Sequence, residues 1–316
     1  MRHDKIFRIL PILIACLLTH VCALAGVRLE APARAARGDA FLALAAADQP
    51  ATCFTFHWRG KSYKAVAQRA ADAGGQWQAV ILLPVPLDEK AQRLELAVTS
   101  GREGPGSRAS DDVAKANMAI ALYDRERPVQ KLTVDKKYVN PPAAQQERIK
   151  KDREKVRRIL SVYLPERYWT LPFERPVPGG VSSLFGMKRV FNGQPRSVHR
   201  GLDLRGAQGT PIRACADGEV ALADNLYFSG NAVYINHGEG VFSAYLHMSE
   251  SKVKAGERVR KGQVVGLVGA TGRVTGPHLH LSLIVQGQSV DPQPFLAAPA
   301  AGAKPGAAAI SSGNAR

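Results

Sequence analysis

The chain has 316 residues, a length typical of two domains rather than one, and its 45% content of hydrophobic residues fits an ordinary globular protein. A formal charge of +16 favours association with polyanions: nucleic acid, anionic lipid or the anionic polymers of a bacterial cell wall. The sequence contains no Arg-rich helix with interleaved aromatic residues, so only charge supports nucleic acid, and we predict no nucleic-acid partner.

The first residues are typical of a secretory signal. The basic start "MRHDKIFR" precedes a mostly apolar run, and Ala23 and Ala25 form an A-x-A cleavage pattern. We predict a signal peptide over residues 1–25. An uncleaved membrane anchor is a second reading, but a proline and a histidine interrupt a run already short for spanning. A lipoprotein signal ending at Cys16 is a third. In each case the mature protein leaves the cytosol for the periplasm or cell envelope.

Two of the four cysteines lie outside this segment. Cys53 and Cys215 could pair in an oxidising compartment or stay as two buried thiols, because connectivity cannot be read from sequence. They lack the CxxC spacing of a zinc or redox site, so we assign them no chemical role.

Residues 26–140 consist of short strand-like segments separated by turns. "CFTFHW" alternates in polarity, "AVILLPVPL" is a buried run, and "DAGGQ" and "SGREGPGSR" are turn-rich separators. This spacing predicts an N-terminal β-sandwich-like domain. His57 lies there alone, and we interpret it as structural.

The pattern of short strands ends at the segment "PPAAQQERIKKDREKVRRILSVYL", which is rich in charged residues. Two prolines suit a helix start, a partial apolar stripe follows, and Glu147 with Lys151 forms an i,i+4 pair. We predict a basic helical linker over residues 141–165, whose charge run is most simply a solvated face. At the other end, residues 298–316 are rich in Ala, Gly and Pro, and we predict a disordered tail.

Residues 166–297 again consist of strand-like segments and Gly-rich turns, and they contain the candidate catalytic and metal-binding residues. "SVHRGLDLRG" holds His199 and Asp203, and Gly201 with the following "LDL" indicates a loop running into a strand. "AYLHMS" supplies His247. "GPHLHL" supplies His278 and His280, which share one face of a strand. The stretch "GATGRVTGP" before that strand predicts either a loop beside an open groove or an ordinary hairpin connection.

Four histidines and one carboxylate in one domain suit a catalytic metal. A catalytic zinc typically takes three ligands from His, Asp or Glu and keeps a fourth position for water. The remaining histidines could then transfer protons. Each histidine taken singly could be structural. We assign His237 to that role because it sits in a Gly-flanked turn with no partner.

Residues 181–296, with "VSSLFGMKR", "HRGLDL", "GTPIRACADGEV", "AYLHMS" and "GPHLHLSL", resemble the lysostaphin-type zinc metallopeptidases of bacterial cell walls. The resemblance implies a mainly β fold with an antiparallel-β catalytic domain. It also implies one Zn²⁺ bound by His199, Asp203 and His280, with His247 and His278 as catalytic residues beside the open position. No departure occurs at these five positions. The N-terminal region resembles, more weakly, the β-domain of some exported members.

The resulting expectation is an exported zinc metalloendopeptidase that hydrolyses the peptide cross-links of peptidoglycan. A separate β-domain without wall-targeting repeats favours a D,D-endopeptidase over a glycyl-glycine endopeptidase. Two other readings stay open: a non-enzymatic activator of a cell-wall amidase, and a basic surface-binding protein with a vestigial site. The expected partners are peptidoglycan stem peptides and anionic envelope polymers. The sequence does not predict the oligomeric state.

Overall fold

The computed structural model describes residues 19–24, 26–70, 75–101 and 114–298. Most of the predicted signal peptide therefore lies outside the described residues, as does nearly all of the predicted tail. Within the predicted signal peptide, strand β1 (Thr19–Leu24) pairs antiparallel with β2 (Val27–Pro32). In the described part of the chain, no helix has the length and apolar character needed to cross a membrane.

The chain divides into two compact units that alternate along the sequence. Unit 1 comprises Met1–Arg34, Leu42–Val80 and Arg93–Ala121, and unit 2 comprises Ala35–Phe41, Ile81–Gln92 and Leu122–Arg316. Cys53 belongs to unit 1 and Cys215 to unit 2, and both are free thiols. The mainly β fold class is confirmed, while the individual domain boundaries stay predictions.

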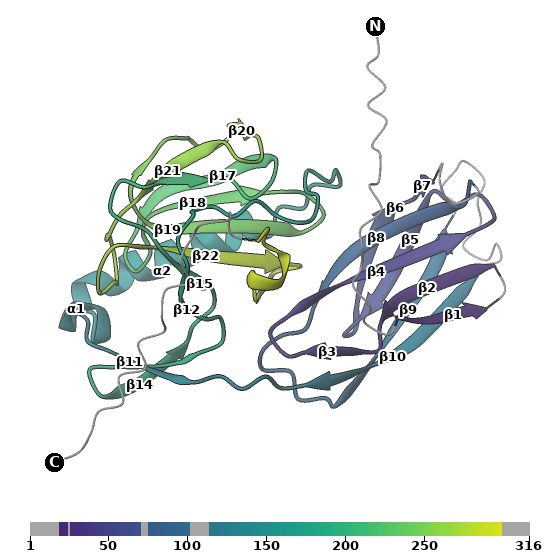
Figure 1. Cartoon of the computed structure of the whole chain (residues 1–316), viewed down its shortest axis with the longest axis horizontal. Helices are drawn as coiled ribbons and strands as arrows, with labels where there is room; N and C mark the ends of the chain where they lie inside the picture. The colour runs from purple at the N-terminus through teal and green to yellow at the C-terminus, as the bar shows by residue number, and fades with distance from the viewer. Residues whose placement is uncertain (1–18, 25, 71–74, 102–113, 299–316) are drawn as a thin grey trace, which may run out of the picture. The chain divides into compact units, whose positions relative to one another are not determined.

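Two five-stranded sheets carry unit 1, in the orders β1-β2-β4-β8-β7 and β3-β10-β9-β5-β6 (Figure 1). The alternation of "CFTFHW" explains how β5 packs, because Phe54, Phe56 and Trp58 share one strand face and are fully buried. The further strands are β3 (Arg34–Ala36), β4 (Ala40–Ala47), β5 (Cys53–Trp58), β6 (Lys61–Val66), β7 (Gln68–Arg69), β8 (Trp77–Pro84), β9 (Arg93–Gly101) and β10 (Lys115–Tyr123).

A ten-stranded sheet forms the centre of unit 2, with the main order β12-β15-β22-β19-β18-β17-β20. A second sheet joins β11, β13 and β14. The strands are β11 (Val129–Leu132), β12 (Val181–Ser183), β13 (Lys188–Phe191), β14 (Gln194–Val198), β15 (Leu202–Arg205), β16 (Pro211–Arg213), β17 (Gly218–Leu226), β18 (Gly230–Asn236), β19 (Val241–Ser251), β20 (Arg258–Val259), β21 (Val264–Val268), β22 (His278–Val285) and β23 (Gln288–Val290). The helical elements are α1 (Lys136–Val139), α2 (Ala143–Leu160) and the 3-10 turn η1 (Gln293–Phe295).

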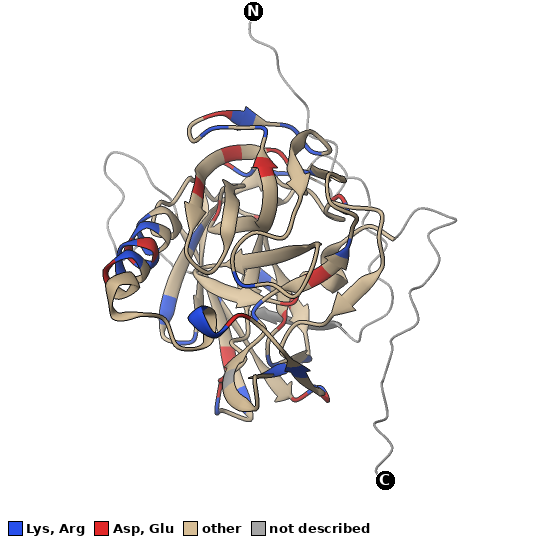
Figure 2. Ribbon diagram, turned by 90° about the vertical axis from the view of Figure 1, so that its left-hand side faces the viewer, with Lys and Arg blue, Asp and Glu red and all other residues tan. Residues whose placement is uncertain are grey.

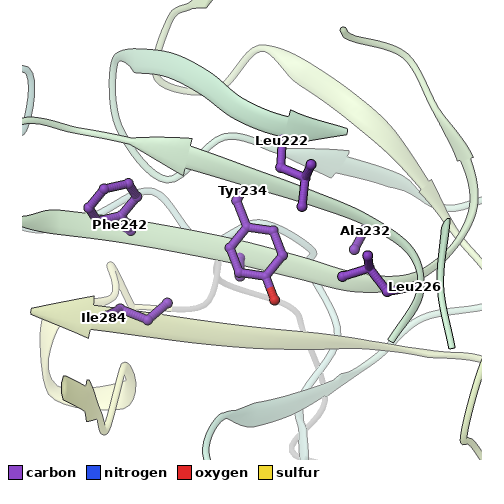
Figure 3. Close-up of a cluster of buried hydrophobic side chains, with 7 residues drawn as sticks. Leu222, Leu226, Ala232, Tyr234, Phe242 and Ile284 are labelled. Atoms are coloured by element: carbon purple, nitrogen blue, oxygen red, sulfur yellow. The ribbon is translucent and has the colours of Figure 1, made fainter. Parts of the chain in front are cut away.

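One face of the ten-stranded sheet carries an apolar cluster, and helix α2 packs against this cluster. Figure 3 shows the cluster, whose buried members are Leu222, Leu226, Ala232, Tyr234, Phe242, Ala244 and Ile284. Val156, Ile159 and Leu160 of α2 pack against it. The partial apolar stripe of the predicted helix is thus its contact with the sheet. Its charged residues are mostly exposed, and Figure 2 marks their positions in blue and red along the helix ribbon.

Candidate metal centre

Three side chains from one loop and two paired strands converge at a single point. His199 directly follows β14, Asp203 lies in β15, and His280 lies opposite Asp203 in the antiparallel register of β15 and β22. His199 Nε2 lies 3.0 Å from Asp203 Oδ1 and 3.0 Å from His280 Nδ1. The distance from His280 Nδ1 to Asp203 Oδ1 is 2.8 Å. All three residues are buried.

These three donor atoms match the ligand set of a tetrahedral zinc site. Zinc–ligand bonds of 2.0–2.1 Å place neighbouring ligands of a tetrahedron about 3.3 Å apart. The measured separations of 2.8–3.0 Å are close to that edge length. Two imidazoles and one carboxylate leave a fourth position open, so the residues present fit a catalytic metal ion rather than a closed structural one.

Hydrogen bonds to the opposite ring nitrogen orient both imidazoles. His199 Nδ1–H donates to the carbonyl oxygen of Leu184 at 2.7 Å, which leaves the Nε2 lone pair facing Asp203. His280 Nε2–H donates to Ser282 Oγ at 2.9 Å, and this hydroxyl donates to the carbonyl oxygen of Arg200 at 3.1 Å. Such partners fix the tautomer that a metal needs. The site therefore uses Nε2 of one histidine and Nδ1 of the other.

The second oxygen of the carboxylate is held by an arginine. Arg189 Nη2 donates to Asp203 Oδ2 at 2.6 Å, and Arg189 Nε donates to Gln130 Oε1 at 3.1 Å. Gln130 lies opposite Arg189 in the parallel pair of β11 and β13. Burial raises the pKa of Asp203, but His199 and His280, when they carry protons on the nitrogens that face Asp203 in place of a metal ion, outweigh burial and hold that pKa well below its usual range. The carboxylate is therefore ionised, with Oδ1 directed at the two histidines.

The glycine of "HRGLD" is required by close packing. A Cβ atom at Gly201 would lie 2.3 Å from His280 Nε2 and 2.7 Å from the carbonyl oxygen of Leu281. Any larger residue at this position would displace the imidazole, so the glycine permits the close approach of β15 to β22.

Two further histidines stand beside the donor group. The pairing of β18 with β19 shifts register between Asn231 and Val233, and within this bulge His247 adopts a positive φ of 66°. Such bulges re-aim a side chain next to active sites. The imidazoles of His247 and His278 have centroids 5.2 Å apart, and His278 Nε2 lies 3.8 Å from Asp203 Oδ1.

Both of these rings are also fixed through Nδ1. His247 Nδ1–H donates to the carbonyl oxygen of Thr271 at 2.9 Å, and His278 Nδ1–H donates to that of Gly276 at 2.8 Å. Burial, aided by the charges of His280 and His278, lowers the pKa of His247 to about 3. A neutral imidazole with Nε2 unprotonated can accept a proton.

These groups open into one cavity of about 450 Å³. Asp203, His247 and His278 line it, together with the loop of residues 273–277 and side chains of β11 and β13. The Gly-rich stretch before β22 therefore lies beside a groove, which was the first of its two predicted roles.

The structure brings all five predicted site residues together and places His237 and His57 elsewhere. His237 is buried within the sheet, where Nδ1 lies 2.7 Å from the carbonyl oxygen of Asp217 and Nε2 lies 2.7 Å from Ser243 Oγ. The burial and these contacts support a structural role for His237, but our expectation that it has no partner is wrong, because the antiparallel pairing of β17 and β18 places Asp217 beside it. His57 lies on β5, with Nδ1 3.0 Å from Ser62 Oγ.

Sequence reasoning missed the residues that orient the site. Ser282 carried a usable signal, since it lies two positions after His280 and so shares its strand face. Arg189 and Gln130 carried none, because a parallel pairing between β11 and β13 brings them together from distant parts of the chain.

Comparison with known proteins places these residues in a recognised domain. The sequence model of Peptidase family M23 matches residues 197–292. Peptidoglycan DD-endopeptidase ShyC of Vibrio cholerae is 45% identical over 115 residues, which are 36% of this chain and 26% of that protein. DD-carboxypeptidase/endopeptidase Mpg of Neisseria meningitidis is 43% identical over 112 residues, which are 35% of this chain and 26% of that protein. The matched region thus spans about a quarter of these curated relatives.

One solved structure is similar over most of the chain. It is described as a peptidase M23 from Pseudomonas aeruginosa and superimposes with a TM-score of 0.59 at 27% sequence identity. The superposition covers 82% of this chain and 94% of that one.

Proposed function

Because its C-terminal domain belongs to Peptidase family M23, we propose that the chain is an exported zinc metalloendopeptidase that hydrolyses peptide cross-links of peptidoglycan. The observation that carries this proposal is the convergence of His199, Asp203 and His280, with donor atoms 2.8–3.0 Å apart, at the cavity lined by His247 and His278. A peptidase domain and a His-Asp-His group support metal-assisted hydrolysis of an amide.

The roles of the residues follow from their hydrogen bonds. When bound, zinc supplies Lewis-acid polarisation of the scissile carbonyl and of the attacking water. His247 and His278 each keep Nδ1–H on a backbone carbonyl, so their Nε2 atoms face the cavity. One Nε2 accepts the proton of the attacking water, and an imidazolium Nε2–H returns a proton to the leaving amine. Arg189 keeps Asp203 Oδ2 engaged, which leaves Oδ1 as the single donor.

The nature of the cleaved bond is argued from the relatives. ShyC of Vibrio cholerae is named a peptidoglycan DD-endopeptidase, and Mpg carries the same activity in its name. These names favour a D,D cross-link over a glycyl-glycine bridge. The net charge of +16 suits a cell envelope rich in anionic polymers, to which the predicted signal peptide would direct the chain.

A non-enzymatic activator of an amidase would need neither the three donors nor the two further histidines. The complete set of five, with each imidazole tautomer fixed by a partner, argues for catalysis.

The proposal is tested by digesting purified cross-linked peptidoglycan with the zinc-loaded protein and identifying the new peptide termini by mass spectrometry. Cross-linked dimers should decline as monomers with new D-alanyl carboxylates appear, and His280→Ala should produce none. Undiminished dimers with a protein that holds one zinc per chain would refute endopeptidase activity.

A further inference from the structure

An arginine in the groove has an unusual environment. Arg273 lies in the loop before β22 and lines the same cavity as His247 and His278. Its guanidinium carbon lies over two aromatic rings, 4.8 Å from the centroid of Phe191 and 4.8 Å from that of Phe228. Within the described ranges, no carboxylate pairs with it and no hydrogen bond leaves its guanidinium.

The charge balance of the cavity leaves this cation uncompensated. Among the described residues that line the cavity, Asp203 is the only carboxylate, and it already contacts Arg189 and the two ligand histidines. Arg205 also lines the cavity but is exposed to water. Burial and the charge of Arg189 lower the pKa of Arg273 to about 10, which still leaves it charged at neutral pH. A half-buried cation without a counter-charge is a site for an anion.

We propose that Arg273 binds a carboxylate on the carbon that carries the scissile nitrogen, and so selects the cross-link that is cleaved. The proposal rests on the proposed function and deepens it. In one class of cross-link, D-alanine is joined to an amino group of a diamino acid, and the carbon that bears this amino group also bears a carboxylate. The leaving amine therefore has a carboxylate on its own carbon. The leaving glycine of a glycyl-glycine bridge has its carboxyl group bound in the next amide. A guanidinium beside the site can bind the free carboxylate of the first class of cross-link and finds no such group in a glycyl-glycine bridge.

The contacts with the two aromatic rings favour the binding of a carboxylate by Arg273. A guanidinium presents parallel N–H groups that match both oxygens of a carboxylate. Contact with two aromatic rings restrains the side chain and partly desolvates it in advance, so little side-chain entropy is lost on binding. The shared cavity of about 450 Å³ places the bound carboxylate in the same space as the imidazoles of His247 and His278.

The same chemistry occurs at a peptide that ends in D-alanyl-D-alanine, because the terminal residue also carries a carboxylate beside the scissile nitrogen. Cleavage assays of the zinc-loaded full chain on three substrates distinguish a carboxylate in a cross-link from the carboxylate of a terminal D-alanine. The first substrate is a D-alanyl cross-linked peptide with a free carboxylate on the leaving residue, and the second is the same peptide with a carboxamide there. The third is a peptide ending in D-alanyl-D-alanine.

The wild-type protein should prefer the carboxylate cross-link over the carboxamide by roughly 10- to 100-fold in kcat/KM, the range for a hydrogen-bonded charge. Arg273→Gln should bring this ratio close to one by slowing the carboxylate substrate alone. Arg273→Lys should keep part of the preference. Arg205→Gln is the matched control, because it removes a water-exposed arginine from the same cavity, and it should keep the preference. Each ratio is measured within one preparation, so partial unfolding or metal loss cancels.

The outcomes separate the inference from the proposed function. Cleavage of none of the substrates by zinc-loaded protein refutes the peptidase activity itself. Equal cleavage of the two cross-linked peptides by the wild type overturns the role of Arg273 while the peptidase stands. An equal loss of preference in Arg205→Gln overturns it too, since a general positive field would then suffice. A loss confined to the cross-linked peptide assigns Arg273 to the cross-link, and a loss shared with the D-alanyl-D-alanine peptide assigns it to both.

Discussion

Ser282→Ala should weaken zinc binding without removing a ligand. Its hydroxyl accepts the Nε2–H of His280 at 2.9 Å and donates to the carbonyl oxygen of Arg200 at 3.1 Å. Without it, a buried N–H loses its partner at a cost of about 1–3 kcal/mol. The imidazole is then free to turn or to carry its proton on Nδ1, where the metal must bind. Since about 1.4 kcal/mol is tenfold, we expect a loss of roughly 10- to 100-fold in zinc affinity.

A second serine–histidine pair in the same sheet supplies the control. Ser243 Oγ lies 2.7 Å from His237 Nε2 and 2.8 Å from Tyr245 Oη, and no ligand atom of the candidate metal centre takes part. Ser243→Ala should lower the free energy of unfolding by about 1–3 kcal/mol yet leave zinc affinity unchanged. Competition with a chromophoric chelator measures affinity, and urea unfolding measures stability. Equal zinc affinities in Ser282→Ala and the wild type would refute the reasoning that the hydroxyl sets the tautomer of His280.

Three further predictions follow from the same geometry. His247→Ala and His278→Ala should retain one zinc per chain and lose roughly 10²–10⁴-fold in rate; a folded but metal-free variant would make that residue a ligand. Gly201→Ala places a Cβ 2.3 Å from His280 Nε2 and should abolish tight zinc binding, so wild-type affinity in a chelator titration would contradict this packing. Burial lowers the pKa of His237 from 6.5 to about 4, so the unfolded chain takes up a proton that the native state resists. Stability is therefore complete above pH 6.5 and declines by about 1.4 kcal/mol per pH unit down to pH 4. Between pH 7 and 4.5, His237→Gln should lose about 2–3 kcal/mol less than the wild type in urea unfolding, and identical losses would exclude His237 as the cause.

The sequence identified the residues of the candidate metal centre more completely than the residues around them. Gly201 and the following "LDL" placed His199 on a loop, and the strand period put His278 and His280 on one face, because both features depend on local sequence. His247 reaches the site only through a bulge and a positive φ, which depend on strand register. The Arg189–Asp203 contact depends on tertiary pairing and has no local signal. Helix α2 was predicted from its prolines and ion pairs, but its packing on the sheet required the partner strands.

The central claim is tested most directly by titrating metal-free protein with zinc while counting cleaved peptidoglycan cross-links. The account predicts that cleavage rises in proportion to added zinc and stops rising at one zinc per chain. Cleavage by the metal-free protein, or no cleavage once one zinc is bound, would contradict it.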